Sequence, residues 1–139
     1  MKGLILAAGY GTRLYPLTLD RPKPLIKVGG KTILERLLCK FEALESCDTV
    51  YIVTNDKFYN MVVHWVKEKS FTIKVEVIND LTTTNEDRLG AIGDINLVIE
   101  KENICDDILI VAGDNLFEFN IVEFVAFGQK KEKFSVALF

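Results

Sequence analysis

The chain has 139 residues, of which 49% are hydrophobic and 27% charged, so it is predicted to form a single globular domain with a core of its own. Its net charge of −3 argues against a general affinity for nucleic acid or for an anionic membrane, so any anion site must be local. No stretch approaches the ~20 consecutive apolar residues of a membrane span, and the first apolar run is too short for a signal peptide. Three cysteines without paired spacing indicate reduced thiols, and we expect a cytoplasmic protein.

Strands and helices are predicted to alternate along the chain. Strands are expected at residues 2–6, 49–53, 73–78, 107–111 and 134–139, and helices after Thr32 and at 57–69, 88–102 and 119–129. Thr32 and Glu35 fit a capping box for the first helix, and Asn55-Asp56 is predicted to form a turn or cap before the second. Within the second helix, His64 is expected on the solvent side and Trp65 in the core. This alternation predicts a three-layer α/β fold, a mostly parallel sheet with helices on both faces, whose ligands gather at the carboxyl ends of the strands.

Residues 7–31 are predicted to be a long loop, which begins in the glycine-rich stretch "LAAGYGTR" after the first strand. This stretch does not match the dinucleotide-binding pattern G-x-G-x-x-G, because Leu14 stands at the third glycine position. Gly30-Lys31-Thr32 matches the end of the phosphate-binding loop pattern, but Leu25 stands where that pattern requires its first glycine. Glycines nevertheless allow backbone N–H groups to close on a phosphate, and Arg13 adds a bidentate donor. On this segment alone, a plain strand-ending turn with a surface arginine explains the residues equally well.

A second motif, "RPKPLIKVGGK", brackets Lys23 between Pro22 and Pro24. Each proline fixes its own φ and restricts the residue before it, so the backbone that carries Lys23 is held stiff. A rigid backbone at this position would hold the Lys23 ammonium group in a fixed place, which favours contact with a phosphate. Lys27 and Lys31 nearby are expected to be solvated.

A third motif, "ILIVAGDNLF", places Asp114 just past a buried strand and after a glycine. A carboxylate at that point can hold Mg²⁺ at the carboxyl edge of the sheet. An Asp-Asn turn or helix cap is the alternative reading of this residue. Asp106 and Asp107 precede the strand, at the wrong end for this role, and are expected on the surface.

Residues 79–93 hold Gly90 and Gly93 inside a predicted helix, where each glycine costs up to ~1 kcal/mol relative to alanine. Two glycines in one turn indicate a close approach, either to a ligand or to a packed strand. A polar loop, 79–87, leads into this helix.

Taken together, "LAAGYGTRLYPLT…RPKPLIKVGGKTIL" resembles the N-terminal signature of the sugar-1-phosphate nucleotidylyltransferases, the group that includes glucose-1-phosphate thymidylyltransferase. The resemblance implies a Rossmann-like nucleotide-diphospho-sugar transferase fold in one nucleotide-binding domain, residues 1–139. It implies three catalytic residues: Arg13 on the β- and γ-phosphates, Lys23 on the sugar phosphate or the α-phosphate, and Asp114 on Mg²⁺. The implied nucleotide-binding residues are Leu6, Ala7, Ala8, Gly9, Gly11, Thr12 and Arg13, with Leu89 and Gly90 at the base and Asn79 as a candidate base reader.

The implied reaction transfers a nucleoside monophosphate from a nucleoside triphosphate to a sugar 1-phosphate, with release of pyrophosphate. The expected partners are these two substrates, with neither nucleic acid nor membrane, and a homo-oligomer is possible. Two alternatives stay open: a non-catalytic nucleotide-sensing subunit of the same fold, and a cytidylyltransferase of an alditol- or choline-type phosphate. The resemblance covers only the front part of a typical family member, and the chain stops on the apolar "FSVALF". We therefore expect a truncated, catalytically incomplete piece, and the motifs leave the base and the sugar open.

Overall fold

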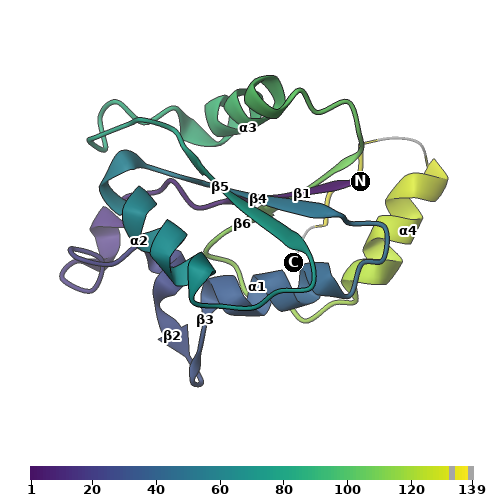
Figure 1. The fold of residues 1–139 in the computed structure, drawn as a ribbon, viewed down its shortest axis with the longest axis horizontal. Coiled ribbons are helices and arrows are strands. Elements are labelled where there is room, and N and C mark those ends of the chain that lie inside the picture. Colours follow the sequence, from purple (N-terminus) through teal and green to yellow (C-terminus); the bar gives the residue numbers. More distant parts are fainter. Residues whose placement is uncertain (132–133, 138–139) are drawn as a thin grey trace.

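The structure is a computed structural model in which residues 1–131 and 134–137 are described. Its centre is a parallel sheet in the strand order β5-β4-β1-β6. The strands are β1 (Lys2–Leu6), β4 (Thr49–Thr54), β5 (Lys74–Asn79) and β6 (Ile108–Ala112). Helices α1 (Ile33–Glu42) and α2 (Asp56–Lys67) cover one face, and α3 (Gly90–Glu102) covers the other (Figure 1). The predicted three-layer α/β fold is confirmed.

The two central strands carry the core because their side chains are apolar on both faces of the sheet. Ile5 and Ile52 belong to the cluster that includes the inner side of α1, whereas Leu4 and Val53 belong to the cluster beneath α3. All four side chains are fully buried. Leu4 pairs with Tyr51 of β4 and Ile110 of β6 in register, which fixes the carboxyl ends of these strands at one edge.

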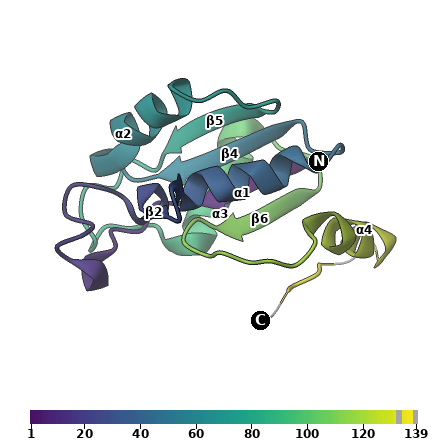
Figure 2. The same cartoon turned by 90° about the horizontal axis from the view of Figure 1, so that it is seen from below.

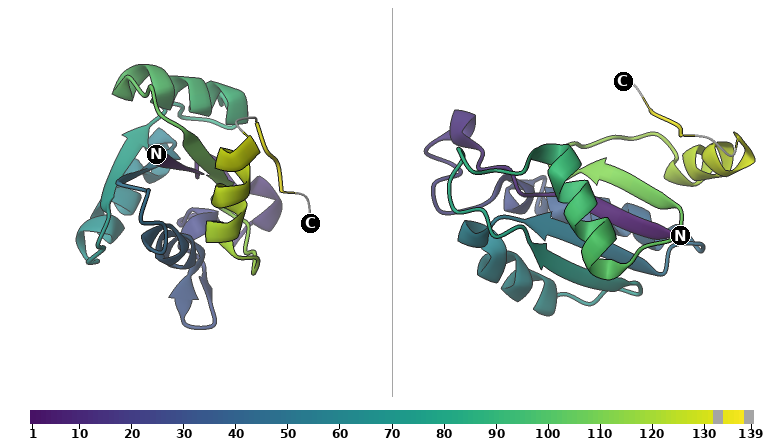
Figure 3. Two further views of the ribbon diagram at one scale, coloured as in Figure 1. Left: turned by 90° about the vertical axis from the view of Figure 1, so that its right-hand side faces the viewer. Right: turned by 90° about the horizontal axis from the view of Figure 1, so that it is seen from above.

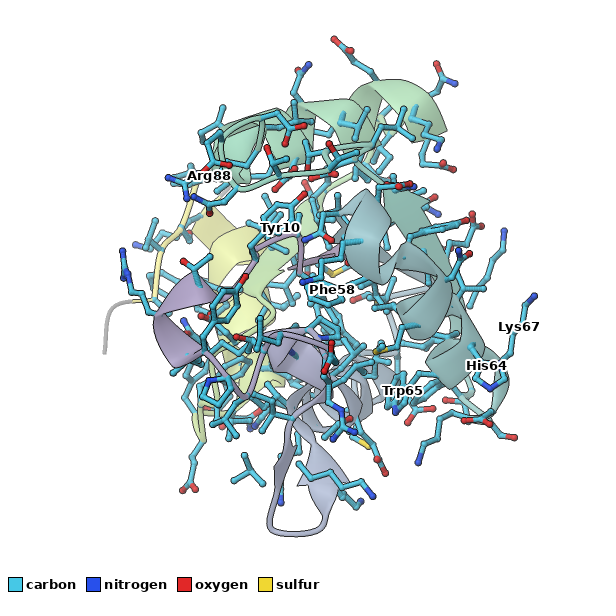
Figure 4. The ribbon with its side chains drawn as sticks, turned by 90° about the vertical axis from the view of Figure 1, so that its left-hand side faces the viewer. Tyr10, Phe58, His64, Trp65, Lys67 and Arg88 are labelled. Carbon is cyan, nitrogen blue, oxygen red and sulfur yellow. The ribbon has the colours of Figure 1, made fainter. Side chains whose placement is uncertain are left out.

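The helix starts follow the predicted caps. The hydroxyl of Thr32 accepts a hydrogen bond from the Glu35 amide at 3.1 Å, and Asn55 caps α2 in the same way through Phe58. His64 is exposed and Trp65 packs against the core from the partly buried side of α2, as expected (Figure 4). The fourth helix, α4 (Ile121–Lys131), lies near the amino end of β6, beside α1 (Figure 2).

Two stretches differ from the sequence prediction. Residues 7–31, expected to be loop, contain a two-stranded hairpin of β2 (Lys27–Val28) and β3 (Lys31–Thr32), which projects from the body (Figure 3, left). Gly29 and Gly30, both with positive φ, supply the two-residue turn that such a hairpin requires. Residues 134–137 of the predicted last strand form no strand, because extended segments need a paired neighbour to be stable. Residues 138 and 139 lie outside the described part.

Candidate active site

The glycine loop and the Pro-Lys-Pro segment pack against Gly113, which lies far from both in the sequence. Its amide donates to the carbonyl oxygen of Leu6 at 2.7 Å. A Cβ atom at this position would lie 2.6 Å from that oxygen, 3.2 Å from Cγ of Pro24 and 3.3 Å from Cα of Ala7. Only glycine permits this approach, which joins the glycine loop, the Pro-Lys-Pro segment and the end of β6.

The side chains of Lys23 and Asp114 form an ion pair at this junction. Lys23 Nζ lies 2.7 Å from Asp114 Oδ2, although the two residues are 91 positions apart in the chain. Lys23 begins a short 3₁₀ turn, η2 (Lys23–Leu25), which is anchored by the buried Pro24 and Leu25. The lysine side chain is 35% exposed and the aspartate side chain 44%, so both charged groups remain accessible to solvent.

Arg13 extends from the glycine loop at the same edge of the sheet. It lies in the 3₁₀ turn η1 (Thr12–Leu14), which follows Gly11 at a φ of 62°. The carbonyl of Gly11 accepts a hydrogen bond from the buried Thr18 hydroxyl at 2.7 Å. In the described part of the chain, the exposed Arg13 guanidinium makes no hydrogen bond or ion pair. The loop therefore combines a fixed backbone with a guanidinium group that has no protein partner among the described residues. This combination is suited to binding an anion.

Asn55 is a structural part of this site that the sequence analysis identified only as a turn or cap. Its side chain is fully buried. While Oδ1 caps α2, Nδ2 donates to the carbonyl of Ala8 at 2.8 Å. The backbone of the glycine loop is thus tied to the carboxyl end of β4. The position of an asparagine directly after a buried strand predicts the capping bond to the Phe58 amide. The bond to the Ala8 carbonyl becomes visible only in the fold.

The predicted base-binding residues lie on the segment from the end of β5 to the start of α3. Asn79 donates from Nδ2 to Asp56 Oδ1 at 2.7 Å and accepts from the Leu81 amide at 2.8 Å. Leu89 is exposed. Gly90 is the first residue of α3 and has a φ of 73°, with no atom near a Cβ built there. The expectation of a glycine in a helix interior is confirmed for Gly93 and wrong for Gly90. Gly90 satisfies a backbone requirement, and Gly93 makes room for the side chain of Leu89, whose Cβ would lie 2.7 Å from a Cβ at position 93.

A buried polar network underlies this segment, and the sequence analysis missed it. The hydroxyls of Tyr10 and Thr82 lie 3.2 Å apart, and Thr82 donates from both its hydroxyl and its amide to Asp80 Oδ1 at 2.8 Å. In Figure 4, Tyr10 of the glycine loop lies on the side of the loop that faces α3. Burial raises the pKa of Asp80, and the hydrogen bonds from Thr82 oppose that rise. Burial, and then the charge of Asp80, raises the pKa of Asp94 on α3 to about 6.

Asp114 suits a magnesium ion that is bound mostly by substrate. Mg²⁺ is often held by one or two carboxylates together with substrate phosphates and water. Among the described residues there is no group of three or more His, Cys, Asp or Glu side chains that could hold a metal. Asp114 is exposed, and of its two oxygens Oδ2 is the one paired with Lys23. The donor set fits a metal that arrives with a triphosphate and does not fit a permanently bound ion.

A separate hollow of about 1260 Å³ lies along β6, between that strand, α4 and residues 134–137. Its walls are mainly apolar, with Ile110, Phe124 and Val125 among the lining residues. None of the predicted site residues lines it. Because these mainly apolar walls suit an anionic ligand poorly, we place the candidate site at the carboxyl ends of β1 and β6.

The parallel sheet, with a glycine loop and a lysine–aspartate pair at its carboxyl edge, defines a three-layer α/β protein with its candidate site at that edge. The chain belongs to the nucleotidyl transferase family, whose model matches residues 2–139. It is 34% identical over 125 residues to the bifunctional protein GlmU of Methanococcus vannielii, covering 90% of this chain and 27% of that protein. It is 33% identical over 135 residues to a mannose-1-phosphate guanyltransferase of Pichia angusta, covering 91% of this chain and 34% of that protein.

The fold is shared with solved structures. HddC from Yersinia pseudotuberculosis, solved in complex with GMP-PN, superposes with a TM-score of 0.72 and 25% identity over 91% of this chain and 53% of that one. The chain thus spans between a quarter and about a third of the length of these two curated relatives and about half of this solved neighbour. None of the helices described here is both long and apolar enough to cross a membrane.

Proposed function

We propose that the protein is a sugar-1-phosphate nucleotidylyltransferase, and that this chain carries its nucleotide half-site. The ion pair between Lys23 and Asp114 is the observation that carries the proposal. It joins two of the three motifs by which the sequence resembles this group, beside the glycine loop that forms the third. Family membership and the names of the relatives support the same class of reaction.

In the proposed reaction, a phosphate oxygen of the sugar 1-phosphate attacks the α-phosphorus of a nucleoside triphosphate. The bond between the α-phosphorus and its bridging oxygen breaks, and pyrophosphate leaves with that oxygen. Because the attacking oxygen is already ionised at neutral pH, the protein needs no strong general base. Its contribution is positioning and charge neutralisation.

Each of the three charged residues has a role in this proposal. Arg13 holds the β- and γ-phosphates, and the amides from Leu6 to Thr12 line the nucleotide. Lys23 exchanges Asp114 for the sugar phosphate or the α-phosphate when substrates bind. Asp114 would hold Mg²⁺, which supplies charge neutralisation on the phosphates when bound. In this scheme the Lys23–Asp114 pair keeps two substrate-binding groups in place before the substrates arrive.

The nucleotide half of the proposal is tested by thermal denaturation of this chain with Mg²⁺ and ATP, CTP, GTP, UTP or dTTP in turn. A triphosphate at about 100 times its Kd should stabilise the fold by ~2.7 kcal/mol. We expect one triphosphate to do so, and Arg13→Ala to lose the shift. Lys27→Ala removes the same charge from an exposed residue of β2 and should keep it. Equal shifts in both variants would contradict the role of Arg13.

The denaturation series and an assay of pyrophosphate release together distinguish the two alternatives. Stabilisation by CTP alone favours a cytidylyltransferase. A nucleotide sensor would bind a triphosphate but release no pyrophosphate. In the whole protein, supplied with Mg²⁺ and a sugar 1-phosphate, we expect pyrophosphate release that is lost in Asp114→Asn. Unchanged metal-dependent turnover in that variant would overturn the proposed mechanism.

A further inference from the structure

Two polar side chains from neighbouring elements meet at the carboxyl edge of the sheet. Asn79 is the last residue of β5, and Asp56 is the first residue of α2. Asn79 Nδ2 donates to Asp56 Oδ1 at 2.7 Å, although the two residues are 23 positions apart. Neither element depends on this bond, because Asn55 already caps α2 and Asn79 is in register with Thr54 of β4. The contact therefore calls for a further explanation.

The backbone around this contact is fixed by hydrogen bonds between the same two segments. The Asp56 amide donates to the Thr82 carbonyl at 3.0 Å, and the Asp80 amide donates to the Thr54 carbonyl at 2.9 Å. The Thr82 hydroxyl in turn lies 3.2 Å from the phenol oxygen of Tyr10 in the glycine loop. The segment that follows β5 is therefore held against the start of α2 and touches the glycine loop.

The two hydrogen bonds of the Asn79 side chain define which way its amide group faces. Oδ1 accepts from the Leu81 amide at 2.8 Å, while Nδ2 donates to Asp56. A backbone N–H can only donate and a carboxylate can only accept. Reversing the Asn79 amide would therefore break both bonds and place like partners against each other. The Asp56 carboxylate thus holds the amide in one orientation.

The oriented amide of Asn79 keeps part of its hydrogen-bonding capacity. Nδ2 has a second N–H and Oδ1 a second lone pair. Neither atom has another partner among the described residues, and the side chain is partly exposed. Asn79 therefore offers a donor and an acceptor side by side, in a fixed order.

Nucleobases fall into two classes with respect to such a pair. Guanine, uracil and thymine present a keto oxygen beside a ring N–H, whereas adenine and cytosine present an amino group beside a bare ring nitrogen. The order of donor and acceptor is opposite in the two classes. In a given pose of the base, an amide of fixed orientation matches one class, and an amide that is free to reverse matches both.

We propose that Asp56 is a positioning residue that fixes the amide of Asn79, and that this makes the site discriminate keto bases from amino bases. In this scheme Asp56 touches neither the base nor the phosphates and acts through Asn79 alone. The base-reading role of Asn79 rests on the proposed function, whereas its orientation by Asp56 does not.

The proposal is tested by titration calorimetry of the chain with Mg²⁺ and GTP, UTP, dTTP, ATP or CTP. We expect the preference for the favoured class of base to fall about tenfold in Asp56→Ala, which corresponds to the loss of one hydrogen bond to a charged group. Inorganic tripolyphosphate has no base and should bind the wild type and the variant equally. If Asp56 only stabilised the first turn of α2, all triphosphates would weaken by one factor. An unchanged preference would overturn the proposal.

Three further variants test whether Asp56 acts through Asn79. Asp56→Asn keeps an acceptor oxygen at the same place and should retain most of the preference. Asp106→Ala removes the same charge from an exposed residue before β6 and should leave the preference unchanged. In an Asn79→Ala background, Asp56→Ala should have no further effect on it. An additional loss in that background would overturn the positioning role.

A measurement without ligand separates this inference from the proposed function. In the ¹H–¹⁵N spectrum of the free chain, the side-chain amide protons of Asn79 should exchange with water several-fold faster in Asp56→Ala than in the wild type. Equal rates would show that Asp56 does not hold the amide and would overturn the proposal. Faster exchange in the variant, with no triphosphate bound by either protein, would refute the proposed function and leave the orientation of Asn79 by Asp56 standing.

Discussion

Gly113 and the Lys23–Asp114 pair have different physical roles at the same point of the molecule. Gly113 is required by packing, since a side chain there would strike the Leu6 carbonyl. The ion pair is exposed, and exposed pairs contribute about 0–1 kcal/mol to stability. Stability therefore does not explain why a lysine fixed between two prolines meets this aspartate, whereas the proposed binding of substrate phosphates by these residues would.

Gly113→Ala is expected to lower the free energy of unfolding by about 1–3 kcal/mol, because backbone on both β1 and β6 must shift to admit the new methyl group. Gly9→Ala is the matched control. A Cβ at Gly9 meets nothing within 4 Å, so its stability should change by less than about 0.5 kcal/mol. Chemical denaturation of both variants measures the difference, and equal effects would contradict the packing argument.

At the level of secondary-structure elements, two helix caps look alike in the sequence but make different hydrogen bonds in the fold. Thr32 caps α1 with a single side-chain bond to Glu35. Asn55 caps α2 and also satisfies the carbonyl of Ala8 in the glycine loop. The second cap therefore connects an element of the sheet to the candidate site, and its loss should affect both.

Thr32→Ala is expected to cost about 1 kcal/mol of stability, as for a typical helix cap. Asn55→Ala should cost about 2–3 kcal/mol, since it removes the cap and leaves the buried Ala8 carbonyl without a donor. Asn55→Ser keeps a capping oxygen and should fall between the two values. Urea denaturation provides the measurement. An Asn55→Ala cost no larger than that of Thr32→Ala would show that the bond to Ala8 adds nothing.

Across the whole molecule, burial declines from the centre of the sheet toward β6. β1 lies between β4 and β6, whereas β6 has one partner strand among the described residues. Ile5 on β1 is fully buried, and Ile110 on β6 is 36% exposed. The isoleucine side chains are identical, so their contributions to stability should differ through burial alone.

Ile5→Ala is expected to destabilise the chain by about 3–4 kcal/mol, and Ile110→Ala by about 1 kcal/mol. The larger value reflects the cavity left between β1 and α1, which the surrounding side chains cannot fill. Thermal or urea denaturation of the two variants gives the comparison. Similar costs would mean that the outer side of β6 is more buried in solution than in this structure.

Much of this architecture was determined by local sequence. The apolar runs at 2–6 and 49–53 and the cap residues Thr32 and Asn55 set the strands and helix starts to within a few residues, because strand burial and capping depend on near neighbours in the chain. The glycine–glycine turn at 29 and 30 also carried a usable signal, which the sequence analysis overlooked. The segment at 134–137 shows the limit of that approach: its pattern favours a strand, but a strand needs a partner that sequence pattern cannot supply.

By itself, the sequence determined the alternation of elements and named Arg13, Lys23 and Asp114 as candidates through their motifs. Only the tertiary structure decided that Lys23 meets Asp114 across 91 residues, that Asn55 holds the glycine loop, and that the buried Asp80 is hydrogen-bonded to Thr82 beneath Tyr10. The physical reason is that hydrogen bonds and desolvation act through space. Parallel strands bring their carboxyl ends to one edge from distant parts of the chain, and the energy of a buried carboxyl depends on neighbours that the sequence does not place beside it.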